Sequence, residues 1–327
     1  MTVTASAPGK LVLFGDHAAV YGKPCLVTAV DLRYTVTVTP LDQPIVEIDT
    51  PDLQSRGETY QVSKATVSAH NRPETAFVEA ALTQIFQQHP TSTGFKITTD
   101  GPQISYGLGS SSAITAATLL AAAHSLGITL SLRELFDLAY AAVLDVQRTG
   151  SGVDLAAAIY GGTLYYVNKG EVIDPLPISE LPIVIGYSGE KVSTTNLIAH
   201  VAALRSRQPA LMDSLLHMLG DISTQARDAI MQTDWATLGD LMNIHQGILE
   251  SFGVSTPQLA RLIFASREAG ALGAKLSGAG GGDCMFALAP AETQQAVETA
   301  ITEAGGLVVQ IPSGAPGVRL ENWSHNP

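Results

Sequence analysis

A run of small residues from Gly107 to Ser112 has the composition of a phosphate-binding loop. The run reads Gly-Leu-Gly-Ser-Ser-Ser and opens into a segment, 113–126, that is rich in the helix formers Ala and Leu. The first turn of a helix has backbone N–H groups without partners, and the positive end of the helix dipole favours an anion. The hydroxyls of Ser110, Ser111 and Ser112 could add donors, or a ligand for a phosphate-bound Mg²⁺.

The same residues would also suit a plain turn with a serine N-cap. This stretch alone does not distinguish such a turn from a phosphate-binding loop. The run does not end in the Gly-Lys-Ser/Thr of a P-loop, and it is not a convincing dinucleotide fingerprint. Other residues are therefore needed to decide whether the loop holds a phosphate.

Charged and polar groups gather in two further places. Lys10, Asp16 and His17 flank an apolar run, 11–14, that is short enough for a buried strand. Asp154 follows Gly150-Ser-Gly and opens a short Ala-rich helix, where a carboxylate also serves as an ordinary cap. Taken singly, Lys10, Asp16 and His17 are more typical of an ordinary surface position than of a site. Together they could form a polar cluster at one edge of a sheet.

A second glycine run, Gly-Ala-Gly-Gly-Gly from Gly278 to Gly282, leads into an apolar strand. Four glycines in five residues are costly to order unless the backbone must approach something closely. We interpret this run as a loop that closes over a ligand. Few basic residues lie in or near the motif segments, and they are Lys10, Arg148, Lys191 and Lys275.

The chain has 327 residues, enough for one large domain or two of ordinary size. Its net charge of −12 argues against a nucleic-acid-binding protein, whose surface is normally basic. Cys25 and Cys284 make neither a disulfide framework nor a zinc-ligand pattern, so a reducing compartment is expected. No secretory signal or membrane span is visible in the sequence, which predicts a cytoplasmic location.

Hydrophobic periodicity predicts alternating strands and helices along the chain. Strands are expected at 2–7, 11–14, 25–30, 34–39, 45–48, 94–98, 163–167, 183–187, 284–288 and 307–311. Helices are expected at 73–88, 113–126, 131–147, 196–205, 209–232, 235–252, 256–269 and 291–304. Ser131 and Glu134 predict a capping box. Pro8-Gly9 predicts a turn. An irregular hairpin is expected at 52–67, and a linker is expected in the proline-rich segment 175–182.

Together these segments resemble the GHMP superfamily of small-molecule kinases, over all three of its motifs and nearly the full length. Residues 7–22 and 249–282 are most similar to mevalonate kinases, whereas 148–154 and 277–284 look more like phosphomevalonate kinases. The resemblance implies an α+β, two-domain GHMP kinase fold. An N-terminal α/β domain, 1–178, and a C-terminal ferredoxin-like domain, 179–327, would then have the active site between them.

The resemblance also implies an activity, the ATP- and Mg²⁺-dependent phosphorylation of the primary hydroxyl of mevalonate to 5-phosphomevalonate for isoprenoid precursors. Asp154 would accept the hydroxyl proton, and Lys10 would orient that carboxylate and offset developing charge. The ATP phosphates would lie on Gly107, Leu108, Gly109, Ser110, Ser111 and Ser112, with Ser111 also a Mg²⁺ ligand. Substrate contacts would come from Asp16, His17, Arg148, Ser193, Thr194, Gly278, Ala279 and Gly280.

Two positions depart from the mevalonate kinase pattern. Asp16 replaces the usual Glu, and Val143 stands where those kinases carry a Glu that helps to bind Mg²⁺. Phosphomevalonate is the alternative substrate, because 148–154 and 277–284 look more like phosphomevalonate kinases. A catalytically inactive, ligand-sensing protein of the same fold is the alternative outside enzymes, but both Lys10 and Asp154 are present. Small molecules are the expected partners, nucleic acids and membranes are not, and the sequence allows a homodimer.

Overall fold

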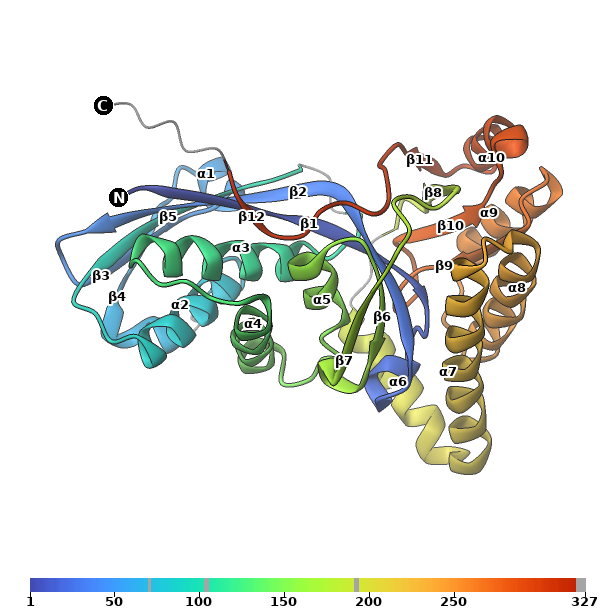
Figure 1. Ribbon diagram of the computed structural model, residues 1–327, viewed down its shortest axis with the longest axis horizontal. Helices are drawn as coiled ribbons and strands as arrows, with labels where there is room; N and C mark the ends of the chain where they lie inside the picture. The colour runs from blue at the N-terminus through green and yellow to red at the C-terminus, as the bar shows by residue number, and fades with distance from the viewer. Residues whose placement is uncertain (70–71, 103–105, 191–193, 322–327) are drawn as a thin grey trace.

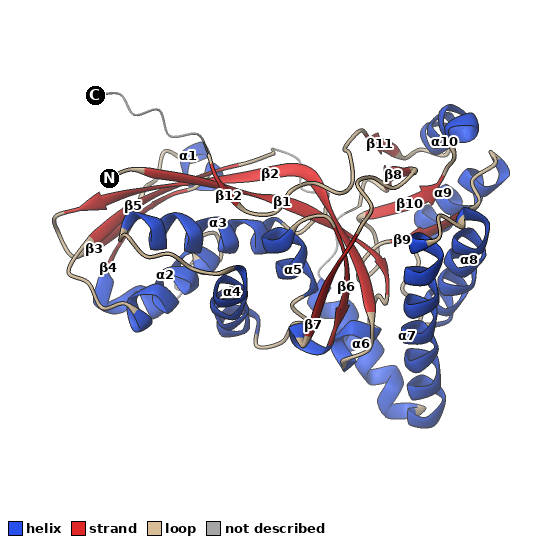
Figure 2. Ribbon diagram, viewed as in Figure 1, coloured by secondary structure: helices blue, strands red, loops and turns tan. Residues whose placement is uncertain are grey.

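The computed structural model describes residues 1–69, 72–102, 106–190 and 194–321. Within them the strands form two separate sheets, a large one that carries both ends of the described chain and a smaller one (Figure 2). Helices pack along one face of the large sheet, and a second set of helices packs against the small sheet (Figure 1).

Among the described residues, the large sheet has eight strands, in the order β12-β1-β2-β5-β3-β4, with β6 paired to β2 and β7 to β6. The 17-residue β2 pairs with β6 through its first residues and with β5 through its last ones. Every pair is antiparallel except β3 with β5. The strands are β1 (Val3–Phe14), β2 (Cys25–Leu41), β3 (Ile45–Asp49), β4 (Tyr60–Ser63), β5 (Gly94–Asp100), β6 (Thr163–Val167), β7 (Val172–Leu176) and β12 (Arg319–Leu320).

The turn predicted at Pro8-Gly9 is wrong, because β1 continues through it. The pairing of β1 with β2 shifts there, since Pro8 faces Arg33 while Gly9 faces Val30. The shift is an irregularity in the ladder of the kind that bends a strand. Just after it, the backbone N–H of Lys10 donates a hydrogen bond of 2.8 Å to Leu108 O. The irregularity thus attaches β1 to the glycine-serine run.

Four helices lie along one face of the large sheet (Figure 1). The central one, α3, buries Ala113, Ala116 and Ala117, and these small side chains let it pack closely on β1 and β2. The predicted capping box of Ser131 and Glu134 is confirmed at the start of α4. The helices are α2 (Ala76–Gln88), α3 (Ser110–Ser125), α4 (Leu132–Gln147) and α5 (Val153–Tyr160).

The small sheet has the antiparallel order β11-β8-β10-β9. Its chain order is strand, helices, strand, strand, helix, strand, which is the ferredoxin-like pattern that the resemblance implies. Four helices fill the first crossover. The elements are β8 (Ile183–Tyr187), α6 (Thr194–Arg207), α7 (Pro209–Met231), α8 (Trp235–Ser251), α9 (Pro257–Glu268), β9 (Gly273–Leu276), β10 (Cys284–Leu288), α10 (Ala291–Glu303) and β11 (Leu307–Val309).

Several short elements differ from the sequence-based expectation. The irregular hairpin expected at 52–67 contains a helix, a strand and a 3-10 turn, and the expected linker begins inside β7. The chain passes between the sheets after Leu176, and β12 then returns to pair with β1. The domain division at 178/179 therefore stays a prediction. The remaining elements are α1 (Pro51–Ser55) and the 3-10 helices η1 (Ala18–Tyr21), η2 (Lys64–Ala69) and η3 (Asn168–Gly170).

No helix in the described part of the chain is both long enough and apolar enough to cross a membrane. The apolar run expected at 113–126 is a core helix, since α3 packs against the large sheet and against α2, α4 and α5.

Candidate active site

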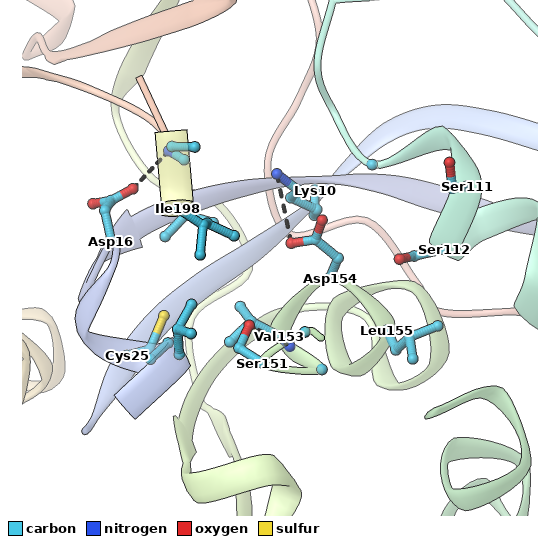
Figure 3. Close-up of a pocket in the computed structure, with 18 of the residues that line it drawn as sticks. Lys10, Asp16, Cys25, Ser111, Ser112, Ser151, Val153, Asp154, Leu155 and Ile198 are labelled. Carbon is cyan, nitrogen blue, oxygen red and sulfur yellow. Dashed lines mark hydrogen bonds and ion pairs between the residues drawn. The ribbon is translucent and has the colours of Figure 1, made fainter. Parts of the chain in front are cut away.

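A cavity of about 340 Å³ brings together residues from both parts of the fold. Strand β1, the N-termini of α3 and α5, and the second glycine run all contribute to its wall (Figure 3). The sequence-predicted residues that line it are Lys10, Asp16, His17, Gly107, Gly109, Ser110, Ser111, Ser112, Asp154, Gly278 and Ala279.

Lys10 and Asp154 point toward each other at the wall of the cavity (Figure 3). Lys10 Nζ lies 3.5 Å from Asp154 Oδ1 and also 3.5 Å from Gly107 O. The lysine side chain is buried on β1, whereas the aspartate side chain, in the first turn of α5, is 43% exposed. An acceptor molecule in the cavity can therefore reach the carboxylate while the ammonium group stays fixed behind it.

The three serines form the first turn of α3, and the N-cap is Gly109 in the left-handed conformation. The interpretation as a turn capped by serine is therefore wrong, because no side chain caps this helix. Its first N–H groups have no intrahelical partner and lie at the cavity wall, an arrangement that suits an anion. Leu108, which was expected to contact the ATP phosphates, is buried and does not line the cavity; its backbone oxygen accepts the hydrogen bond from Lys10 N–H.

His17 joins the loop after β1 to the second glycine run. It adopts a left-handed backbone conformation with φ of 61°, and its Nε2 donates a 3.0 Å hydrogen bond to Ala279 O. Burial lowers the pKa of His17, and its ring meets Phe252 edge-on. The imidazole is therefore a neutral group that holds two parts of the cavity wall together.

Asp16 is engaged within the protein. Its Oδ2 lies 2.6 Å from Lys275 Nζ, and its Oδ1 accepts a 2.6 Å hydrogen bond from Gly278 N–H. Both side chains are completely buried, so Lys275 does not supply the charge for a substrate phosphate. This ion pair links the loop after β1 to β9 and fixes the start of the glycine run.

Gly280 does not line the cavity, which corrects its interpretation as a residue that approaches a ligand. It is left-handed, and a Cβ on it would lie 2.3 Å from Val254 O. The next residue, Gly281, donates a 2.6 Å hydrogen bond to the same carbonyl. The glycine run therefore needs small residues here because it packs against the loop after α8.

Comparisons with known proteins show the family to which the chain belongs. The family models described as "GHMP kinases N terminal domain" and "GHMP kinases C terminal" match residues 76–162 and 226–307. The chain is 38% identical to a mevalonate kinase of Thermococcus sibiricus, over 98% of this chain and 99% of that protein. It is 37% identical to a mevalonate kinase of Pyrococcus horikoshii over 98% of both chains. The chain belongs to the GHMP kinases. Membership of this kinase family implies ATP as the phosphoryl donor.

Solved GHMP kinase structures share the fold. The mevalonate kinase of Methanococcus jannaschii superposes with a TM-score of 0.78 at 24% identity, covering 98% of each chain. A Streptococcus pneumoniae phosphomevalonate kinase, in complex with phosphomevalonate and AMPPNP, gives a TM-score of 0.80 at 18% identity, over 95% of this chain and 99% of that one. The predicted two-domain GHMP kinase fold is confirmed.

Besides Gly280, one more of the predicted substrate contacts, Arg148, lies away from the cavity wall. Arg148 has an 84% exposed side chain, lies 3.9 Å from Asp145 and does not line the cavity. Ser193 lies outside the described residues, and Thr194 begins α6. Sequence reasoning assigned no role to the other lining residues, although several of them lie within the segments 7–22, 148–154 and 277–284. The missed ones are Val12, Gly15, Ala19, Val20, Cys25, Gln147, Thr149, Gly150, Ser151, Gly152, Val153, Leu155, Thr195, Ile198, Ser277 and Asp283.

Val143 lines the cavity at the position where the resemblance implied a Glu. Within the described residues, no group of three or more His, Cys, Asp or Glu side chains could hold a metal ion. The protein donor that the resemblance assigned to Mg²⁺ is Ser111, which lies in the first turn of α3 at the cavity wall.

The free energy of unfolding should fall as the pH drops, because His245 gains a proton on unfolding. This residue on α8 is completely buried, and its Nε2 accepts a 3.0 Å hydrogen bond from Gly15 N–H. Burial and then the charge of Lys275 hold the pKa of His245 well below 6.5. Below a pH of about 6.5 the unfolded chain binds a proton at His245 that the folded chain does not. The free energy of unfolding therefore falls by at most about 1.4 kcal/mol per pH unit from this residue.

Urea unfolding at about pH 7.5 and about pH 5.5 measures this effect. His245→Gln should lose less stability between the two pH values than the unchanged protein does. The control is His217→Gln on the exposed face of α7, which should keep the full loss. An equal loss in His245→Gln and in the unchanged protein would contradict the assignment.

Proposed function

We propose that this kinase transfers the γ-phosphoryl group of ATP to the primary hydroxyl of mevalonate. The observation that carries the proposal is the pairing of Lys10 with Asp154 at 3.5 Å in a cavity whose wall includes the first turn of α3. The names of the relatives at 37–38% identity support mevalonate as the acceptor. The location in the cytoplasm and a homodimer remain predictions.

In the proposed reaction, Asp154 accepts the proton of the mevalonate hydroxyl as its oxygen attacks the γ-phosphorus. Lys10 holds the carboxylate in place and offsets the charge that develops on the transferred group. The N–H groups and hydroxyls at the start of α3 hold the phosphates of ATP. The bond from the γ-phosphorus to the bridging oxygen breaks, and ADP leaves.

The donor set at the cavity wall fits a Mg²⁺ ion that takes most of its ligands from ATP and water. Mg²⁺ commonly keeps several waters and binds substrate phosphates with few protein groups. Ser111 is the proposed protein ligand, and Val143 can supply none. The ion would neutralise phosphate charge during the transfer.

The distribution of charge supports mevalonate over phosphomevalonate. Lys10 is the one Lys or Arg among the described lining residues, which also include the carboxylates Asp154 and Asp283 and, paired with Lys275, Asp16. A substrate phosphate brings nearly two negative charges and calls for additional positive groups. Arg148, the best candidate from the sequence, is directed to solvent instead.

The kcat/KM for mevalonate should exceed that for phosphomevalonate at least tenfold, or about 1.4 kcal/mol of transition-state binding. Initial rates of ADP release with each acceptor measure the ratio. Arg148→Ala should change mevalonate turnover less than about twofold, because its side chain lies outside the cavity. If phosphomevalonate is preferred and Arg148→Ala removes that preference, the kinase acts on phosphomevalonate.

A further inference from the structure

Two tyrosine hydroxyls hold the turn that leads into α5. Tyr140 on α4 donates a 3.0 Å hydrogen bond to Gly150 O, and Tyr166 on β6 donates one to Ser151 O. Gly150 and Ser151 are consecutive residues, and the two tyrosines reach their carbonyl groups from different elements, α4 and β6. The path of the backbone is therefore fixed from two sides immediately before Asp154.

The two rings are themselves held firmly. Phe136 stacks on Tyr140 with ring centroids 6.0 Å apart and meets Tyr166 at 6.4 Å. Both Phe136 and Tyr166 are completely buried. Burial also raises the pKa of Tyr166 far above its usual value, so its hydroxyl stays protonated and remains a donor.

The turn fits closely over this cluster at Gly152. This glycine is left-handed with φ of 82°, and a Cβ on it would lie 2.6 Å from Tyr166 Oη and 3.2 Å from the Tyr140 ring. Gly152 is also the N-cap of α5, and its carbonyl accepts the first helical hydrogen bond, 3.0 Å from Ala156 N. The tyrosines thus set the position at which α5 begins.

The start of α5 in turn places the proposed base. Asp154 is the second residue of this helix, and no side chain caps the helix. Its carboxylate lies 3.5 Å from Lys10 Nζ, a separation that leaves it dependent on the backbone for its exact position. A small shift of a reacting group can lower a rate by orders of magnitude.

We propose that Tyr140 and Tyr166 are positioning residues for phosphoryl transfer, which act by fixing the turn that carries Asp154. The inference rests on the proposed role of Asp154 as the base. It assigns a function to two hydroxyl groups that lie outside the glycine-rich motifs and do not line the cavity.

Tyr140→Phe and Tyr166→Phe test the proposal, since each removes one hydroxyl and keeps the ring. Each change should lower kcat about tenfold, with the KM values for ATP and mevalonate within about twofold of the original. The matched control is Tyr165→Phe, whose hydroxyl bonds Thr224 on α7 at 3.1 Å and should leave kcat unchanged. Tyr140, which is only partly buried, keeps the test available if Tyr166→Phe does not fold.

A double-mutant cycle with Asp154→Asn separates positioning from general weakening of the fold. Tyr140→Phe should reduce residual turnover less than about twofold in the Asp154→Asn background, because its effect passes through that carboxylate. A tenfold loss in both backgrounds, or a kcat within twofold of the original for both folded Phe variants, overturns the proposal. Normal turnover of Asp154→Asn alone would instead remove the proposed base, and the inference with it.

Discussion

Asp154→Asn should lower kcat by about 10²–10⁴-fold while the affinity for an ATP analogue stays close to that of the unchanged kinase. The amide keeps the shape of the side chain but cannot accept the proton of the acceptor hydroxyl. The phosphate-binding groups at the start of α3 are not altered, so nucleotide binding should persist. Single-turnover rates and a calorimetric titration with the analogue measure the two quantities separately.

The matched control for this change is Asp137→Asn. Asp137 lies on the exposed face of α4, where it pairs with Arg133 one turn away. Losing such a surface pair costs little, so this variant should keep its turnover. Turnover of Asp154→Asn near that of the control would show that another group accepts the proton.

Lys275→Met should lower the free energy of unfolding by about 3–5 kcal/mol, the range found when one member of a buried ion pair is removed. The change leaves the Asp16 carboxylate buried without its cation, since the two side chains are 0% exposed and 2.6 Å apart. The Gly278 N–H would be its remaining partner at 2.6 Å. Urea unfolding followed by circular dichroism measures the loss.

Two further variants identify the cause of that loss. Lys96→Met, on the exposed side of β5, should change stability by less than about 0.5 kcal/mol. Asp16→Asn combined with Lys275→Met should lose less than the sum of the two single changes, because the pair is removed together. Strict additivity, or a single-variant loss below about 1 kcal/mol, would mean that the ion pair does not stabilise the fold.

The fold class and most elements followed from the sequence because the motifs and the hydrophobic periods are local signals. The helix expected at 113–126 is present, and its start moves to Ser110 because Gly109 can adopt the left-handed N-cap conformation. Strand β12 was not predicted, since a two-residue strand has no period and is defined only by its pairing with β1. The turn at Pro8-Gly9 was predicted wrongly because the continuation of β1 depends on pairing with distant residues. Pro8 pairs with Arg33, and Gly9 pairs with Val30.

At the site, the sequence could indicate which residues carry chemistry but not which of them already have partners. Lys275 and Asp16 are 259 residues apart, so their ion pair arises only when the two sheets pack together. The sequence suggested that Gly280 approaches a ligand. In the structure, the atom that a Cβ on Gly280 would meet is instead Val254 O. Arg148 lies next to lining residues in sequence, yet its own side chain extends into solvent.

The most direct test of the account is a phosphorus NMR spectrum of the purified chain with mevalonate, ATP and Mg²⁺. We expect one new phosphomonoester signal, coupled to the protons of the primary carbon, that grows in step with ADP. Loss of this signal in Asp154→Asn would tie it to the cavity. ADP formed without a phosphomonoester, or a diphosphate product formed only from phosphomevalonate, would contradict the proposed function.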